Sequence, residues 1–305
     1  MFARYDYKAG TTLANLIADV AAILTGTTDK ATLSADCVQA STEIISTVAA
    51  GWVMHDAAAG ANKICLKSLN VDGGTYKYMT LDFNTANQIT VLGYESWNAS
   101  THVGVNPTYY SGTNGYFAIS ISSGGTLFIF GSARYALLCG VSSTFVWSQL
   151  VGLVEYTRDD PWNTVANGYP AYGLFSSTAL SNCSPSNNSN NLFNPPRVKD
   201  TSGDKTGLNS GLGYSNKMML AMYTTYYITQ LMDVNGVAYY PLLTLRVSIA
   251  GVSVLTRTTG MLGGTLLGIY ITVFNIGSNG DEVTYNSAQY FIHKIPGAAL
   301  ALPKF

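Results

Sequence analysis

The first part of the chain carries apolar side chains at helical spacing. Between residues 13 and 24 they recur three and four positions apart, at Leu13, Leu16, Ile17, Val20, Ile23 and Leu24. This period matches one face of an α-helix. Thr11 or Thr12 suits the N-cap and Gly26 suits the C-terminal stop, so the pattern predicts a helix over residues 12–25.

A second segment near the start has a less definite pattern. Ser34 could cap another helix, and residues 37–47 suit either a short helix or a strand because they combine Thr and Ile with Ala. Together with the first helix, this segment predicts an N-terminal helical part spanning residues 1–50.

From Gly51 onward the pattern changes to short runs rich in Tyr, Ile, Val and Thr, separated by Gly, Asn and Asp. Such runs are typical of antiparallel strands. The first group of predicted strands covers residues 63–69, 76–83, 89–95, 117–121, 127–130, 134–141 and 145–156. The turn-like residues 122–125 predict a hairpin between the strands 117–121 and 127–130.

A second group of predicted strands follows residue 217. Asn235-Gly236 predicts a tight hairpin between residues 228–234 and 237–243, because both residues tolerate the positive φ of a type I′ turn. Residues 243–249 and 251–257 predict another hairpin. Residues 266–276 predict a long inner strand, and the strands 282–285 and 288–295 are expected to close the sheet.

The spacing of these runs predicts a mainly β protein with β-sandwich or barrel-like domains and a short N-terminal helical segment. Four parts are expected: 1–50 helical, 51–157 β, 158–216 irregular and loop-rich, and 217–305 a second β region. The third part is rich in Asn, Ser and Gly. Residues 258–280 lack charge, but only 266–276 are convincingly apolar, which is too short for membrane insertion.

Charge is scarce along the whole chain. Only 11% of the residues are charged and the net charge is −1, whereas globular proteins average about 25% charged residues. No basic patch stands out, so no nucleic-acid partner is expected. Permanent interfaces are poor in charge and rich in Tyr, of which this chain has 21. The composition therefore favours a subunit that packs into an assembly.

Cysteine and histidine give no sign of a metal or catalytic site. The thiols of Cys37, Cys65, Cys139 and Cys183 are far apart in sequence and are expected to be small buried apolar groups, with disulfide formation left open. His55, His102 and His293 are not at metal-ligand spacing. His293 is expected to be half-buried, on one strand face with Phe291 and Ile295.

Three acidic motifs resemble functional sites but do not meet the requirements of one. Asp204-Lys205-Thr206-Gly207 resembles the phosphorylated motif of P-type cation pumps, but Leu208 follows in place of Thr. Asp159 and Asp160 are adjacent and would face opposite ways on a strand. Asp200, Ser202 and Asp204 could bind Ca²⁺ but lack a bidentate Glu. We therefore predict that the chain has no catalytic, cofactor-binding or metal-binding residue and that the protein is not an enzyme.

Tyrosine doublets are the positive functional feature. Tyr109-Tyr110, Tyr226-Tyr227 and Tyr239-Tyr240 should each point one ring outward, and Trp162 lies in the loop-rich part. Exposed aromatic rings serve both sugar stacking and subunit packing. Packing is favoured because Tyr is spread along the chain.

Several stretches resemble structural proteins of tailed bacteriophages. They are TEIISTVAAGW at residues 42–52, His55-Asp56, YESWNASTH at 94–102, GTLFIF at 125–130 and RDDPWNT at 158–164. The resemblance covers the N-terminal half and implies a virion component of the tail, baseplate or neck. It carries over no catalytic residue.

The function expected from the sequence is therefore that of a structural virion subunit, assembled in the bacterial cytoplasm, which packs against other virion proteins and copies of itself. Residues 12–25 and 158–213 are the expected contact elements, and deletion of 182–194 is expected to impair assembly without unfolding the chain. The alternatives are a receptor- or carbohydrate-binding tail tip or fibre protein with a host glycan as partner, a capsid decoration protein, and a glycan depolymerase.

Overall fold

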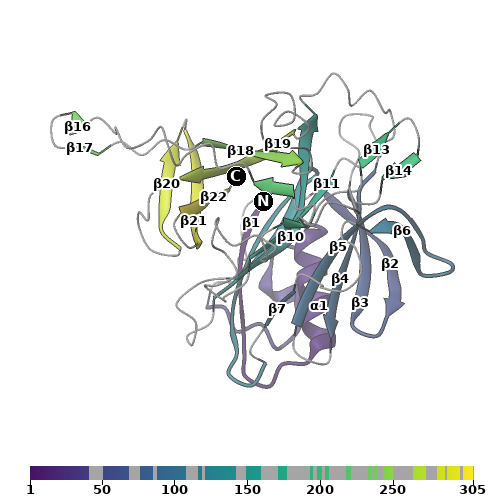
Figure 1. Cartoon of the computed structure of the whole chain (residues 1–305). Helices are drawn as coiled ribbons and strands as arrows, with labels where there is room; N and C mark the ends of the chain where they lie inside the picture. Colours follow the sequence, from purple (N-terminus) through teal and green to yellow (C-terminus); the bar gives the residue numbers. More distant parts are fainter. Residues whose placement is uncertain are drawn as a thin grey trace.

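The computed structural model describes residues 1–40, 51–68, 76–84, 88–107, 116–118, 121–141, 149–158 and 171–176, followed by the shorter segments 193–194, 198–200, 203–205, 218–220, 233–234, 237–238, 243–249, 264–272, 280–285, 287–295 and 298–304. Within them the protein is mainly β, with antiparallel sheets and one short N-terminal α-helix (Figure 1). The fold class expected from the sequence is confirmed, and the layers are sandwich-like.

One sheet is built from six strands in the first half of the chain. They are β2 (Trp52–Gly60), β3 (Lys63–Ser68), β4 (Tyr78–Asn84), β5 (Gln88–Asn98), β6 (Val103–Pro107) and β7 (Tyr116–Ala118). The order is β2-β3-β4-β5-β6, and β7 pairs with the beginning of β5 while β6 pairs with its end. The predicted strands 63–69, 76–83 and 89–95 are confirmed, and they pair as consecutive antiparallel neighbours.

A larger sheet of twelve strands joins the beginning, middle and end of the chain. Its main path is β1 (Phe2–Tyr7), β8 (Gly125–Ser132), β9 (Tyr135–Val141), β10 (Gln149–Arg158), β19 (Gly264–Thr272), β22 (Ala298–Pro303), β21 (Ala288–Ile295) and β20 (Glu282–Tyr285). Four strands lie off this path. β11 (Ala171–Ser176) pairs with β10 and with β12 (Phe193–Asn194), and β18 (Leu243–Ile249) pairs with β19 and with β15 (Met218–Leu220).

Two small hairpins stand apart from these sheets. They are β13 (Val198–Asp200) with β14 (Gly203–Lys205), and β16 (Asp233–Val234) with β17 (Val237–Ala238). The second hairpin confirms the pairing expected around Asn235-Gly236, because Val234 lies opposite Val237. Most of the predicted strands that flank it, and the predicted strand 251–257, lie outside the described residues.

The helix α1 (Leu13–Leu24) is one residue shorter at each end than the predicted helix. The hydroxyl of Thr12 accepts a hydrogen bond from the Asn15 amide at 3.1 Å, so Thr12 is the N-cap. Gly26 follows the C-cap with a φ of 118°, which side chains rarely tolerate. A short 3₁₀ turn, η1 (Lys30–Thr32), comes next.

The helix lies between the two sheets (Figure 1). Its buried residues Leu16, Ile17, Val20 and Leu24 share one core with side chains from β1, β2, β3, β4, β5, β8 and β9. Ala14 and Ala18 are the exposed residues of the helix. The apolar face of the helix is thus used inside the molecule, and only its exposed face is open to the contacts with other subunits expected for residues 12–25.

The first strand was not predicted from the sequence. In β1, Ala3, Tyr5 and Tyr7 are buried, whereas Arg4 is exposed. This period of two is typical of a half-buried strand, and β1 pairs with β8 along its whole length. Residues 1–37 thus share a core with the β part, and the boundary set at residues 157/158 falls inside β10.

Three further differences from the sequence-based expectations concern strand pairing. The expected hairpin between 117–121 and 127–130 is wrong, since β7 pairs with β5 and β8 pairs with β1 and β9. The turn near Gly124 instead carries the chain from one sheet to the other. The strand β22 was missed, and it lies between β21 and β19, so β21 does not close the sheet.

The part expected to be irregular, residues 158–216, contains paired strands. Here β11 pairs with β10 over six residues, and β12 pairs with β11. The strand β11 was not predicted, because its short run of apolar and aromatic residues lies among many Asn, Ser and Gly residues. In the other uncertain segment, Cys37 forms a β-bridge with Tyr7 in place of a helix, and residues 41–50 lie outside the described part.

The larger sheet curls back on itself. Phe291 of β21 lies 4.8 Å from Phe128 of β8 and 6.3 Å from Phe2 of β1, measured between ring centroids. The ammonium of Lys304 lies 4.8 Å from the ring centre of Phe2, which brings the two chain ends side by side (Figure 1). Among the described residues, none of the helices is long and apolar enough to cross a membrane.

Candidate contact surface

A buried carboxylate organises one end of the first sheet. Asp56 of β2 is 6% exposed. Its Oδ2 atom accepts hydrogen bonds from Nε1 of Trp97 at 2.8 Å and lies 2.9 Å from Nδ1 of His102, while Oδ1 accepts from the Ala58 amide at 2.9 Å. Asp56 therefore ties β2 to the end of β5 and to the turn before β6.

The charge of Asp56 is stabilised by these partners. Burial alone would raise its pKa, but the hydrogen bonds from His102, Trp97 and Ala58 outweigh burial and hold the pKa below its usual value. Asp56 thus stays ionised at neutral pH. One ring edge of His102 faces Asp56 through Nδ1. The His102 side chain is 43% exposed, so the rest of it is accessible to solvent.

Around Asp56 lies a small aromatic cluster. His55 Nε2 is 3.4 Å from the carbonyl oxygen of Trp97, and its ring is 5.0 Å from that of Tyr78. Tyr94 and Trp97 meet edge to face at 5.0 Å. Tyr94 and Trp97 are 8% and 7% exposed, so neither offers an open stacking face to a sugar.

The turn between β5 and β6 is fixed by its own residues. The side-chain oxygen of Asn98 accepts hydrogen bonds from the amides of Ser100 at 2.9 Å and Thr101 at 3.2 Å. His102 follows with a positive φ of 58°. Because His102 also contacts Asp56, the turn is held at both of its ends.

Gly104 allows the β5–β6 hairpin to pack closely. A Cβ atom placed at Gly104 would lie 2.1 Å from Cδ1 of the Tyr94 ring, far inside any normal contact. The Tyr94 ring therefore rests against the backbone of β6, and a side chain at this position would force the two strands apart.

Exposed apolar side chains lie on two of the edge strands of this sheet. Val103 and Val105 of β6 are 57% and 50% exposed, and Val53 and Met54 of β2 are 39% and 44% exposed. Within the described strands, β6 pairs with β5 and β2 pairs with β3 alone. The combination of a strand edge and apolar side chains is typical of a surface that pairs with another chain.

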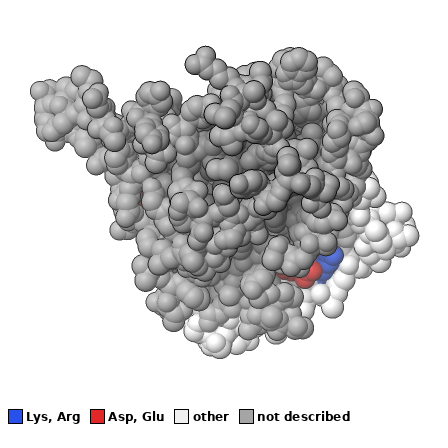
Figure 2. Space-filling model, in the orientation of Figure 1, with Lys and Arg blue, Asp and Glu red and all other residues white. Residues whose placement is uncertain are grey.

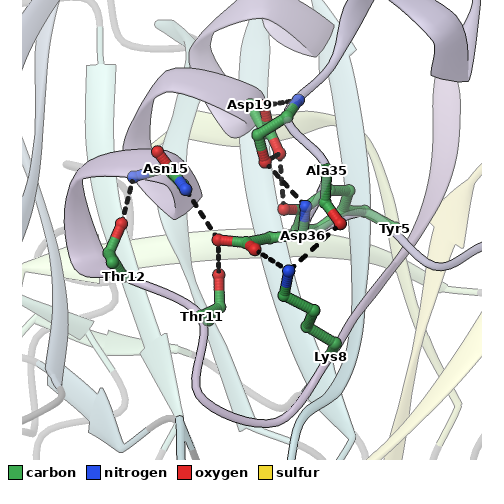
Figure 3. A network of polar contacts seen from close by, with 9 residues as sticks. Tyr5, Lys8, Thr11, Thr12, Asn15, Asp19, Ala35 and Asp36 are labelled. Carbon is green, nitrogen blue, oxygen red and sulfur yellow. Dashed lines mark hydrogen bonds and ion pairs between the residues drawn. The ribbon is translucent and has the colours of Figure 1, made fainter.

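A polar network anchors the N-terminal segment (Figure 3). Asp19 of α1 accepts hydrogen bonds from the Tyr5 hydroxyl at 2.7 Å and from the Ser34 hydroxyl at 2.6 Å. Burial, followed by the contact with Asp19, raises the pKa of Tyr5 well above its usual value. Asp19 thereby joins β1, the helix and the segment after the helix.

The second anchor of this network is Asp36. Its carboxylate accepts hydrogen bonds from Thr11 at 2.8 Å and Asn15 at 2.7 Å, and it pairs with the Lys8 ammonium at 2.6 Å (Figure 3). The Lys8 hydrogen bond, followed by those of Asn15 and Thr11, holds the Asp36 pKa well below its usual value. These contacts link the segment after the helix to the end of β1 and to the start of α1, so their role is structural.

The third histidine lies in the core of the larger sheet. His293 is 0% exposed, and its Nδ1 atom is 3.4 Å from the Cys139 sulfur. Burial lowers the pKa of His293 to about 3, so the ring is neutral at pH 7. His293 was expected to be half-buried, but it is completely buried.

The predicted burial of the cysteines is confirmed for Cys37, Cys65 and Cys139, which are not in disulfide bonds. Burial raises the pKa of the Cys65 thiol to about 12, which disfavours the reactive thiolate. Cys183 lies outside the described residues. Within the described part of the chain, no group of three His, Cys, Asp or Glu side chains could hold a metal ion.

The remaining candidates from the sequence are placed only in part. Asp200 and Asp204 lie on the paired strands β13 and β14, but Ser202 lies outside the described residues. Outside them too are the tyrosine doublets, Trp162, Asp159, Asp160 and the second half of the Asp204-to-Gly207 motif. The cluster at Asp56 was missed, because its members are 41 and 46 residues apart in sequence.

In Figure 2 the described residues are visible at the lower and right margin of the molecule, where one small acidic patch lies next to one small basic patch. No protein-family model matches the chain, and no curated protein matches it in sequence.

Proposed function

We propose that this protein is a structural subunit of a tailed-bacteriophage virion, a tail or baseplate component that acts by packing against other virion proteins and copies of itself. The observation that carries the proposal is the pair of edge strands with exposed apolar side chains, Val103 and Val105 on β6 and Val53 and Met54 on β2, in a chain with 11% charged residues. Such edges offer main-chain hydrogen bonds and apolar contacts to a neighbour.

The resemblance to phage structural proteins supports the virion part of this proposal. Two of the stretches on which it rests, His55-Asp56 and residues 94–102, meet in space through the contacts of Asp56 with Trp97 and His102. The stretch 125–130 forms most of β8, at the centre of the shared core. The similar stretches thus contribute to the scaffold that presents the β6 edge.

The proposed mechanism needs no reacting group. A subunit of this kind works by its shape and by the area that it buries, and charge-poor surfaces lose little free energy when water leaves them. We therefore propose a binding and packing role without catalysis, in which sister subunits and neighbouring virion proteins are the partners.

The proposal is tested on purified particles of the virus that encodes the chain. Antibodies raised against the purified protein should label a fixed place on the tail or baseplate in electron micrographs, and mass spectrometry should find the protein in the same particles. Label confined to the capsid surface would make it a decoration protein. Particles without the protein would overturn the proposal.

A further inference from the structure

We propose that Nε2 of His102 is a nucleophilic modification site, positioned by Asp56, that takes an acyl group from an activated acyl donor. This inference goes beyond the packing role proposed above and does not depend on it. It rests on the burial of the Asp56 carboxylate, on the contact of this carboxylate with Nδ1 of His102, and on the exposure of the His102 side chain.

The contact with Asp56 determines which ring nitrogen of His102 carries a proton. The pKa of Asp56 lies below its usual value, so the carboxyl is ionised at neutral pH and can only accept hydrogen bonds. The distance of 2.9 Å between Oδ2 of Asp56 and Nδ1 of His102 therefore requires a proton on Nδ1. A neutral imidazole carries a single proton, so in the neutral ring the lone pair lies on Nε2.

Nε2 of His102 is available for reaction. In the part of the chain that the structure describes, the His102 side chain has one polar contact, which is that with Asp56. The ring edge that carries Nδ1 faces the buried carboxylate, and 43% of the side chain is exposed. An imidazole nitrogen with an open lone pair is one of the nucleophiles that proteins use for covalent chemistry.

The carboxylate of Asp56 is itself fixed in place. It is 6% exposed, Nε1 of Trp97 donates to its Oδ2 atom at 2.8 Å, and the Ala58 amide donates to its Oδ1 atom at 2.9 Å. A carboxylate held at Nδ1 stabilises the positive charge that develops on the ring when Nε2 attacks. Asp56 is therefore a positioning residue for His102.

The backbone also keeps His102 in one orientation. Its φ of 58° is a left-handed conformation that residues other than Gly adopt where their surroundings fix it. The side chain of Asn98 closes the same turn through the amides of Ser100 and Thr101. The imidazole is thus ordered before a donor arrives, which lowers the entropic cost of reaction.

The proposed step is an acyl transfer. The lone pair of Nε2 forms a bond to the carbonyl carbon of the donor, and the leaving group departs with the electron pair of its bond to that carbon. The ring, which still carries the Nδ1 proton beside Asp56, is then an acylimidazolium cation. Loss of this proton to solvent gives the neutral acylimidazole, so no oxidant or reductant is needed.

The other two histidines lack this combination of features. His293 is 0% exposed, so a donor in solution does not reach it. Nε2 of His55 lies 3.4 Å from the carbonyl oxygen of Trp97. A neutral carbonyl stabilises a positive ring less than a carboxylate does, and among the described residues His55 contacts no carboxylate.

Labelling of the full-length purified protein with diethyl pyrocarbonate tests the proposal, because this reagent is an activated acyl donor. Mass spectrometry of proteolytic peptides at short reaction times gives the rate at which each histidine is modified at pH 7. We expect His102 to react several-fold faster than His55, and the buried His293 to report that the chain stays folded. If His102 reacts no faster than His55, the proposal is wrong.

Two variants separate the effect of Asp56 from simple exposure of His102. Asp56→Asn keeps the size of the side chain and removes its charge, so the labelling rate of His102 should fall several-fold. The matched control is Asp82→Asn, which removes a carboxylate from β4 of the same sheet that does not contact His102. It should leave the rate unchanged, and circular dichroism checks the fold of both variants. An unchanged rate in Asp56→Asn would overturn the positioning role.

Nitrogen NMR of the wild-type protein tests the proton position without any substitution. Long-range proton–nitrogen correlation spectra distinguish a protonated ring nitrogen from an unprotonated one. For the neutral ring of His102 we expect the proton on Nδ1 and the lone pair on Nε2. A neutral ring with its proton on Nε2 would overturn the proposal, whatever the particles of the virus contain.

Discussion

His293 gives the clearest pH dependence of any single residue in this protein. Its ring is enclosed between β21 and β9, and burial lowers its pKa to about 3. In the unfolded chain the pKa of histidine is about 6.5. Below that pH the unfolded state binds one proton more than the folded state, so folded stability must fall as pH decreases from 6.5 towards 3.

The variant His293→Asn isolates this effect, because the amide can occupy the position of Nδ1 beside Cys139 without titrating. Between pH 6 and pH 4 we expect the free energy of unfolding of the wild type to decrease by about 1.4 kcal/mol per pH unit relative to the variant. Urea unfolding at several pH values measures both slopes. Parallel slopes would show that the histidine is accessible to protons in the folded state.

Asp36 is expected to contribute stability through its charge. The pKa of this carboxyl is held below its usual value by Lys8, Asn15 and Thr11, so its contribution is present above pH 4 and is lost as pH falls further. At pH 7, Asp36→Asn should destabilise the protein by about 2 kcal/mol, since hydrogen bonds to a charged group are weakened. Thermal or urea unfolding measures the change.

The exposed ion pair between Arg4 and Asp6 is the control for Asp36. The Arg4 side chain is 58% exposed, and pairs of this kind contribute at most about 1 kcal/mol. Arg4→Gln should therefore have a much smaller effect than Asp36→Asn. Equal effects of the two variants would contradict the anchoring role assigned to Asp36.

At the scale of the elements, α1 is a buried helix that packs between the two sheets. Leu16 is 0% exposed and lies in the shared core. Leu16→Ala should destabilise the protein by about 3 kcal/mol, because it removes apolar contacts and leaves a cavity. Ala18→Ser, at an exposed position of the same helix, should cost less than about 1 kcal/mol. Chemical unfolding of both variants distinguishes a core helix from a peripheral one.

The elements with strong local patterns could be predicted from the sequence. The helix was predicted to within one residue at each end because the apolar period, the Thr12 cap and Gly26 all agree. Strands β3, β4 and β5 followed from their alternation and turns. β1 and β22 were missed because turn residues do not mark both of their limits.

Strand partners could not be predicted, since pairing depends on how the sheets are arranged in space. Residues 117–121 and 127–130 have the local signature of a hairpin, yet β7 and β8 belong to different sheets. In the same way, the contact of Asp56 with His102 arises only when β2 approaches the end of β5. Nothing in the local sequence indicates that approach.

At the scale of the whole molecule, the aromatic group of Phe2, Phe128, Phe130 and Phe291 connects the beginning and end of the chain. Phe291→Ala removes a ring that is 2% exposed, and we expect a loss of about 3 to 4 kcal/mol. Because β21 also pairs with β22 and β20, hydrogen exchange should accelerate across all three strands together. Acceleration confined to β21 would contradict a cooperative C-terminal unit.

The deletion of residues 182–194, which the sequence suggested as a test of assembly, has to be shortened. Residues 193–194 form β12, which pairs with β11, so removal of 182–194 would also remove a strand. Deletion of 182–191 leaves that strand in place. It should preserve the circular dichroism spectrum and impair incorporation into particles, as judged by the amount of the variant in purified virions. Normal incorporation would exclude this segment as a contact.

We propose that this charge-poor chain uses strand edges with exposed apolar side chains to occupy a fixed place among other subunits. Electron cryo-microscopy of the purified virus would test this proposal. We expect density for this fold at a symmetric position in the tail or baseplate, with Val103 and Val105 of β6 buried against a neighbouring chain. A reconstruction in which the fold is absent, or in which β6 faces solvent in every copy, would contradict it.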